Sequence, residues 1–265
     1  MSSPLADYLV TSMPLEGRPI TPPDAAEGGA KIIHSAFHTV ADIMRPTGVS
    51  TRTHGFGVDS SGIYADFNAQ YAQRPATEMG LSISRKITVA FELYSSGDGI
   101  VCETDTTYVN HDGLQIYHEN STGKFYVGTS TAGGLFCQKS APLGTTGVWR
   151  SWVCLIDRDL GATQAVNQIW QDGISLTLTN VSVTGTSGGF NEILMNFMSR
   201  NAGASLKLTG RLRNFHIAAG WWTPATIVDF YRNPYFLFSP EPALYPKRPA
   251  AGGGSTGKSN WWLAA

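Results

Sequence analysis

The sequence predicts an all-β protein, an antiparallel β-sandwich with one short helix near its C-terminal end. Glycine and proline are frequent, with 29 and 14 residues among 265, whereas charged residues make up only 15%. This balance suits many short strands joined by turns. Apolar and polar side chains also alternate after residue 50. The clearest case is Lys86–Tyr94, where one strand face would carry Ile87, Val89, Phe91 and Leu93. A single core is expected for a sandwich of this length.

Turn signals divide the rest of this region into further strands. A hairpin is predicted where Leu114–Glu119 and Lys124–Thr131 flank a Ser-Thr-Gly turn. The segment Asn167–Leu178 is predicted to form two strand pieces, because Asp172-Gly173 in its middle accepts the positive φ of a tight turn. Other strands are expected over Trp149–Asp159, Glu192–Ser199 and Leu206–Ala218.

A helix is predicted between Thr223 and Asn233-Pro234. Thr223 can accept backbone N–H bonds as the N-cap, Pro224 suits the first turn, and Asn233-Pro234 ends the helix. A helix of two turns is not stable alone. It should therefore dock on the sandwich through its apolar side chains, which are Ile227, Phe230 and Tyr231.

The two ends of the chain are rich in proline and glycine, which predicts extended arms on either side of the sandwich. The N-terminal arm is expected over residues 1–49, the sandwich over 50–238 and the C-terminal arm over 239–265. Within the first arm, apolar residues at three- and four-residue spacing predict a short helix over 30–44. These residues are Ile33, Phe37, Val40 and Met44.

The order of the motifs is more specific than any one of them. A strand that begins with Trp and runs into Asp (Trp149–Asp157) precedes two strand pieces joined by Asp-Gly (Ile169–Leu176). A strand that begins with Gly-Arg-Leu (Thr209–Leu212) then precedes the helix and its Asn-Pro end (Ala225–Pro234). Upstream, Gly55–Phe67 looks like an opening hairpin.

Over about residues 50–238 this order resembles the laminin-G-like jelly roll of the concanavalin A-like lectin and glucanase superfamily. The segment Asn233–Pro240 is similar to the endings of phage-borne members. The resemblance implies a jelly-roll sandwich. The chain departs from the family at Arg213-Asn214, where acidic residues are common, and its loops offer no evident set of carboxylates for calcium. No metal or other cofactor is therefore expected.

Glucanases of this superfamily cleave with carboxylates on one strand face, and retaining hydrolysis needs two of them about 5 to 5.5 Å apart. Glu103 and Asp105 would share a face, but Thr106, Thr107 and Tyr108 stand where the family motif continues to a second glutamate. Without that acid/base the reaction cannot proceed, so the chain is expected not to be an enzyme. The alternative interpretation of Glu103 and Asp105 is a solvated strand end.

Two further motifs match functional patterns but lack the sequence context that those functions need. The segment Gly252–Ser259 matches the phosphate-binding loop pattern, but a proline-rich segment precedes it and only six residues follow. Such a loop needs a buried strand before it and a helix N-terminus after it. His34 and His38 have the spacing of a helical metal pair, with no third ligand nearby. Neither motif predicts a site.

Four tryptophans are candidates for binding. Trp221 and Trp222 could offer ring faces to a glycan. Their place between the last strand and the helix instead favours packing of both rings into the core. Trp261 and Trp262, followed by Leu263, lie in a polar tail, where exposed apolar surface costs ~25 cal/mol per Å². These three residues are expected to anchor the chain to a neighbouring subunit or to its own body.

The remaining features limit the function. A net charge of -1 provides no basic field for nucleic acid, and no segment reaches the ~20 apolar residues of a membrane span. Cys102, Cys137 and Cys154 are expected to be small buried side chains. With the phage-like ending, the sequence predicts a phage virion structural protein, a capsid decoration or tail-appendage subunit assembled in the host cytoplasm. Its expected partners are other copies of itself, neighbouring virion proteins and host glycans. The alternative hypothesis is a carbohydrate-binding adhesin for a host surface glycan. A glycan hydrolase is a third and less favoured hypothesis.

Overall fold

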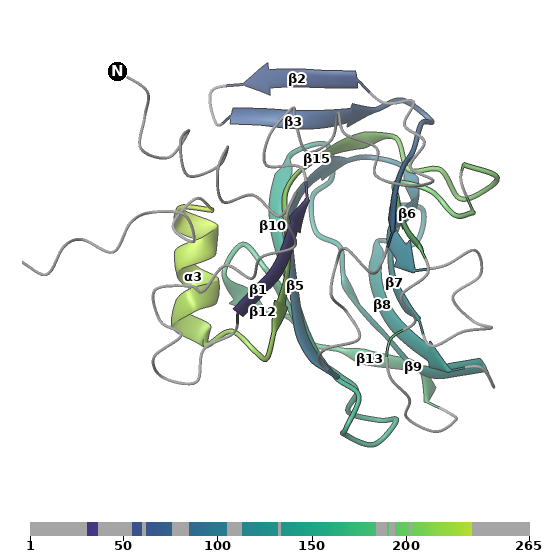
Figure 1. Cartoon of the computed structure of the whole chain (residues 1–265), viewed down its shortest axis with the longest axis vertical. Coiled ribbons are helices and arrows are strands. Elements are labelled where there is room, and N and C mark those ends of the chain that lie inside the picture. The colour runs from purple at the N-terminus through teal and green to yellow at the C-terminus, as the bar shows by residue number, and fades with distance from the viewer. Residues whose placement is uncertain are drawn as a thin grey trace, which may run out of the picture.

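Two antiparallel β-sheets pack face to face, and the helix α3 lies against the outer face of the first sheet (Figure 1). The predicted all-β sandwich with one short helix is thereby confirmed for the described part of the chain. The computed structural model describes residues 31–36, 55–59, 62–75, 85–104, 113–131, 134–183, 190, 194–201 and 203–234.

The first sheet has eight strands within the described residues. Along the sheet their order is β12 (Ile174–Ser175), β11 (Val166–Gln171), β10 (Trp149–Asp157), β5 (Lys86–Ser95), β15 (Gly210–Ala219), β3 (Gly62–Phe67) and β2 (Gly55–Asp59), with β1 (Lys31–Ala36) also paired to β15. The strand over Lys86–Ser95 and the opening hairpin are as predicted. Between β11 and β12, Asp172 and Gly173 have φ values of 52° and 76°, which confirms the predicted tight turn.

The second sheet has seven strands within the described residues. Their order is β13 (Thr179–Val183), β9 (Gly134–Pro142), β8 (Lys124–Thr131), β7 (Leu114–Glu119), β6 (Asp98–Thr104), β14 (Leu194–Phe197) and β4 (Ala72–Pro75). The hairpin of β7 and β8 has the predicted bounds. The strand expected over Glu192–Ser199 ends earlier than predicted, since β14 stops at Phe197.

The main core lies between the sheets and is rich in aromatic rings. The four alternating apolar residues of β5 all face into it, as predicted. Trp152 of β10 stacks on Phe125 of β8, with ring centroids 3.8 Å apart and planes 10° from parallel. Phe215 of β15 contacts Phe197 of β14 edge to face at 5.0 Å. These pairs join one sheet to the other.

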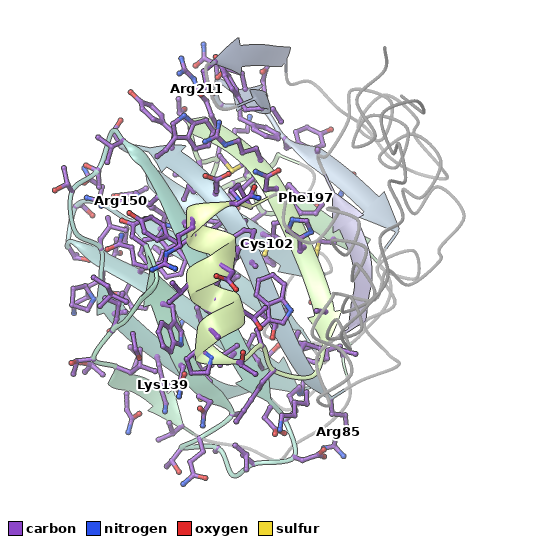
Figure 2. The ribbon with its side chains drawn as sticks, turned by 90° about the vertical axis from the view of Figure 1, so that its left-hand side faces the viewer. Arg85, Cys102, Lys139, Arg150, Phe197 and Arg211 are labelled. Atoms are coloured by element: carbon purple, nitrogen blue, oxygen red, sulfur yellow. The ribbon has the colours of Figure 1, made fainter. Side chains whose placement is uncertain are left out.

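A second apolar cluster lies under α3 (Pro224–Arg232), which covers the strands of the first sheet in Figure 2. The Thr223 side chain accepts a hydrogen bond from the backbone N–H of Thr226 at 3.2 Å, so the predicted N-cap is present. The cluster contains Ala90, Val153, Leu155, Ala218, Trp222, Ile227 and Phe230. Tyr231 is 49% exposed and is not part of this cluster, but its ring lies beside Gly173 in the turn between β11 and β12.

The N-terminal strand β1 corrects the helix predicted over residues 30–44. Lys31–Ala36 is a strand that pairs antiparallel with Phe215–Ala219 of β15. The spacing of apolar residues favoured a helix locally, but pairing with a distant strand satisfies the backbone of this segment and decides its conformation. The remainder of the predicted helix lies outside the described residues.

Arg213 links three strands of the first sheet. Its guanidinium binds Glu92 of β5 at 3.0 Å and Asp59 of β2 at 2.9 Å, and lies 4.0 Å from the centre of the Trp149 ring. Trp149 also donates its indole N–H to Asp59 at 2.9 Å, and Asn214 donates to Glu92 at 2.6 Å. The basic and amide residues at 213 and 214, which depart from the family pattern, thus hold two carboxylates in place.

Candidate functional site

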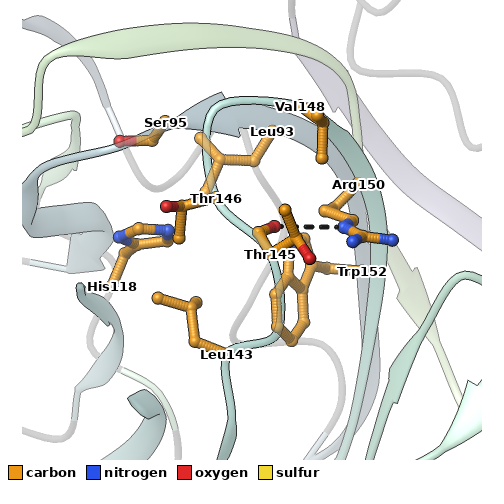
Figure 3. A pocket seen from close by; sticks show the side chains of 9 residues that line it. All are labelled: Leu93, Ser95, His118, Leu143, Thr145, Thr146, Val148, Arg150 and Trp152. Atoms are coloured by element: carbon orange, nitrogen blue, oxygen red, sulfur yellow. Dashed lines mark hydrogen bonds between the residues drawn. The ribbon is translucent and has the colours of Figure 1, made fainter. Parts of the chain in front are cut away.

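A small hollow lies between the sheets at one end of the sandwich (Figure 3). Its volume is about 10 Å³, room for about one water molecule. His118 lies on one side, with Nδ1 2.7 Å from the carbonyl oxygen of Gly97, and burial lowers the pKa of this histidine. Arg150 donates from Nε to the carbonyl oxygen of Thr145 at 3.3 Å. The hollow is therefore too small for an organic ligand.

A larger groove of about 250 Å³ lies over the second sheet. Successive residues of β7 face opposite ways, so Leu114 and Ile116 enter the core while Gln115, Tyr117 and Glu119 line the groove. Figure 1 shows β7, β8 and β9 on the side of the molecule away from α3. The other lining residues are Tyr126 of β8, Gln138 of β9, and Arg200 and Leu206 from the chain after β14.

Two tyrosines form the aromatic part of the groove. The rings of Tyr117 and Tyr126 have centroids 5.9 Å apart and planes inclined by 51°. Glu119 accepts a hydrogen bond from the Tyr126 hydroxyl at 2.9 Å and another from the Thr122 hydroxyl. Burial raises the pKa of both tyrosines, and nearby Glu119 raises it further. Both phenols therefore stay protonated at neutral pH and keep their O–H donors.

A buried ion pair supports the groove from below. Glu103 is fully buried, and its carboxylate accepts hydrogen bonds from Arg200 Nη2 at 2.8 Å, Arg200 Nε at 3.0 Å and Gln115 Nε2 at 2.7 Å. The interpretation of Glu103 as part of a solvated strand end is therefore wrong. A buried carboxylate is tolerated because charged and amide donors replace the lost water. The pair fixes Arg200 and Gln115 as groove residues.

The segment that carries Arg200 and Leu206 is held in an uncommon backbone conformation. Met198, Asn201 and Leu206 have φ values of 60°, 46° and 47°, in the left-handed region that side chains other than glycine seldom adopt. Backbone bonds fasten this segment to β6, from Met198 N–H to Val101 at 3.0 Å and from Ile100 N–H to Leu206 at 2.9 Å. Such conformations persist only where the surroundings enforce them, and they concentrate at functional sites.

The close approach of this segment to β6 also depends on one glycine. A Cβ at residue 99 would lie 2.6 Å from the backbone nitrogen of Leu208 and 2.8 Å from the carbonyl oxygen of Leu206. Any side chain at Gly99 would therefore push the segment away from β6. The wall of the groove is consequently set by backbone packing as well as by the ion pair of Arg200 and Glu103.

The tryptophans predicted as glycan contacts lie elsewhere. Trp222 is 3% exposed beneath α3, which confirms the favoured position in the core, and neither ring face is available to a sugar. Trp221 is partly exposed; its indole N–H donates to the Ile156 carbonyl at 3.1 Å, and the Lys86 ammonium lies 4.1 Å from its ring centre. A glycan contact at Trp221 stays a prediction. The predicted anchor, Trp261, Trp262 and Leu263, lies outside the described residues.

Other chemistry-bearing groups give no competing site in the described part of the chain. Cys102, Cys137 and Cys154 are all buried and unpaired, as predicted, and burial raises the pKa of each thiol. Among the described residues, no three histidine, cysteine, aspartate or glutamate side chains are grouped to hold a metal ion. None of the described helical residues forms a helix long and apolar enough to span a bilayer.

Comparisons with known proteins identify the fold. No family model and no curated protein matches the chain. Among solved structures, the binding domain of Paraclostridial Mosquitocidal Protein 1 is similar with a TM-score of 0.52 and 9% identity, over 77% of this chain and 52% of that one. The binding domain of botulinum neurotoxin DC, solved with rat synaptotagmin II, gives a TM-score of 0.50 and 8% identity, over 75% and 50%.

The chain thus spans about half the length of each of these two structures. Domain 4 of the arabinanase AbnA from Geobacillus stearothermophilus, solved with arabinotriose, gives a TM-score of 0.49 and 12% identity, over 81% of this chain and 98% of that one. The first two likenesses, together with the sheet order, define an antiparallel β-sandwich of the jelly-roll class. The predicted fold is confirmed, and the relation to phage-borne members stays a prediction.

Proposed function

We propose that this protein is a lectin-like module that binds carbohydrate in the groove over the second sheet. The observation that carries the proposal is the pair of tyrosines at 5.9 Å, next to the ion-paired Arg200. Sugar rings present apolar C–H faces and many hydroxyl groups, so their sites combine aromatic rings with a few fixed polar groups. Gln115 and Gln138 add amide groups to this surface.

The rigidity of the groove also supports carbohydrate binding. Arg200 and Gln115 are held by Glu103, and Tyr126 is held by Glu119. Side chains that are ordered before the ligand arrives lose less conformational entropy on binding. A groove of this kind can bind a flexible, well-hydrated oligosaccharide with useful affinity although each sugar hydroxyl contributes little net energy.

Replacing Tyr117 by alanine should reduce glycan affinity by about tenfold or more, because the variant removes one of the two aromatic rings that line the groove. A glycan array identifies the ligand, and titration calorimetry then compares the two proteins. The matched control is Tyr231→Ala, which removes a tyrosine that is 49% exposed on α3 and does not line the groove. Equal affinities in Tyr117→Ala and the parent protein would contradict the assignment of the site.

We also propose that the module does not cleave its ligand. Glu103, the candidate catalytic carboxylate, is fully buried and bonded to Arg200 and Gln115. In this position it supports the groove and does not face a reacting bond. The oligosaccharide recovered after the binding experiment should therefore be intact; shortened products that disappear in Glu103→Gln would overturn this proposal.

The second proposal concerns assembly and rests on the sequence. We propose that the protein is a phage virion structural subunit, either a capsid decoration or a tail-appendage protein, that binds neighbouring subunits through Trp261, Trp262 and Leu263. Two adjacent tryptophans in a polar segment rich in glycine favour an apolar contact with another surface. The module would then be displayed on the virion and bind host glycans.

Deleting residues 250–265 should lower the occupancy of the protein on virions, because the deletion removes the proposed apolar contact. Occupancy is measured by quantitative mass spectrometry of purified particles. The control is Lys258→Ala, which changes the same segment and keeps both tryptophans. Full occupancy after the deletion would contradict the proposal, and it would leave carbohydrate binding by the sandwich unaffected.

A further inference from the structure

We infer that the groove selects uncharged oligosaccharides and discriminates against anionic ones, such as glycans that carry uronic acid, sialic acid or sulfate groups. The inference rests on the proposed carbohydrate-binding function and names the ligand class of the same site. It follows from the two charged side chains among the described residues that line the groove, Arg200 and Glu119, and from Glu103, which is buried beneath the groove and paired with Arg200. Together they give a net charge of one negative.

Arg200, the cation among the described residues that line the groove, is already engaged by a carboxylate. Arg200 binds Glu103 through both Nε and Nη2, at 3.0 Å and 2.8 Å, and its side chain is 26% exposed. An anionic ligand would have to share this guanidinium with a fully buried carboxylate that depends on it. The charge of Glu103 offsets that of Arg200, so a second anion gains little attraction from the same guanidinium. Arg200 is therefore suited to orienting the uncharged polar groups of a ligand and does not serve as a receptor for anions.

The second carboxylate faces the ligand more directly. Glu119 lines the groove and is held there by hydrogen bonds from the Tyr126 and Thr122 hydroxyls. A sugar hydroxyl can donate a hydrogen bond to this carboxylate, whereas a ligand carboxylate or sulfate would be repelled by it. Because the two donors restrain Glu119, its charge stays in the groove wall when a ligand arrives.

The other polar groups that line the groove are uncharged amides and phenols, which also favour neutral ligands. Gln138 and Gln115, whose Nε2 is bonded to Glu103, bring amide groups to the lining, and an amide carries no net charge. Tyr117 and Tyr126 contribute protonated phenols, since burial and Glu119 raise the pKa of both. The groove therefore matches a ligand rich in hydroxyl groups and poor in charge.

The test compares a neutral oligosaccharide with the same oligosaccharide oxidised to a carboxylate at C6. A glycan array of neutral, uronate, sialylated and sulfated glycans first supplies the best neutral ligand, and calorimetry then gives both dissociation constants. We expect the oxidised form to bind about fivefold more weakly, as expected for a like charge near a surface carboxylate. Added salt should reduce this difference, because salt screens exposed charges.

Glu119→Gln keeps a hydrogen-bond acceptor for Tyr126 and removes the charge. The ratio of the two dissociation constants should fall toward one in this variant. Asp159→Asn makes the same change in net charge at a residue whose side chain is 64% exposed and does not line the groove, and should leave the ratio unchanged. Circular dichroism checks that both variants are folded.

The outcomes separate this inference from the proposed function. Tighter binding of the oxidised or sulfated ligands by the parent protein would overturn the inference and leave carbohydrate binding intact. An unchanged ratio in Glu119→Gln would also overturn it, because the carboxylate would then have no part in selection. If no glycan of any class binds, the proposed function fails and the inference fails with it.

Discussion

Replacing Trp152 by alanine is expected to lower the free energy of unfolding by about 3–5 kcal/mol. Trp152 is 1% exposed and stacks on Phe125 of the other sheet at 3.8 Å, so its removal leaves a cavity across the sheet–sheet interface. The surrounding strands are fixed by their ladders and cannot collapse into the space. Urea unfolding followed by tryptophan fluorescence and circular dichroism measures the loss.

The control for this variant is Ile174→Ala, at a residue of β12 that is 67% exposed. Surface substitutions of this kind usually change stability by no more than about 0.5 kcal/mol. A double-mutant cycle with Phe125→Ala then isolates the stacking contribution, which is expected at about 0.5–1.5 kcal/mol. A loss in Trp152→Ala no greater than that in Ile174→Ala would show that the two sheets do not depend on this pair.

Replacing Arg213 by methionine should cost about 3 kcal/mol, the lower end of the range for breaking a buried ion pair. The side chain of Arg213 is 4% exposed, and its removal leaves Glu92 and Asp59 close together without the cation between them. Both carboxylates keep some contact with water, at 14% and 28% exposure, which limits the loss. Chemical unfolding measures the total, and hydrogen exchange shows whether β2 and β3 open first.

Arg211→Met is the matched control because it makes the same change two residues away on β15. Arg211 is 38% exposed; it lies 4.9 Å from the Tyr64 ring centre and 3.7 Å from Asp66. Exposed ion pairs contribute about 0–1 kcal/mol, so this variant should lose no more than that. Equal losses at the two positions would mean that the buried contacts of Arg213 contribute nothing beyond a surface pair.

Much of the fold could be predicted because its signals are local. The alternation in Lys86–Ser95, the Asp172-Gly173 turn and the Thr223 cap each fix a short piece of backbone by nearby side chains. The strand β1 could not be predicted in the same way. Its apolar spacing indicated a helix, and its partner in the sheet lies about 180 residues further along the chain. Pairing between distant strands produces no pattern in the sequence of either strand alone.

In the candidate site, too, some features follow from local sequence patterns and others depend on contacts between distant segments. The alternation in Leu114–Glu119 already placed Gln115, Tyr117 and Glu119 on one strand face, and this was the signal in the sequence that could have indicated the groove. No local pattern joins Glu103 on β6 to Arg200 after β14, because their contact depends on neighbouring strands. The burial of Trp222, by contrast, could be predicted, because its place between the last strand and the helix favoured a position in the core.

The pairing of β1 with β15 has a practical consequence for work with fragments. A fragment beginning at residue 50, the predicted start of the sandwich, would remove the partner of Phe215–Ala219. The backbone N–H and C=O groups on that side of β15 would then be open to strands of other molecules, which is a common origin of aggregation. A soluble fragment should therefore begin before Lys31, so that it keeps β1. This strand of only six residues would then cover the edge of β15 and oppose the formation of fibrils or higher oligomers.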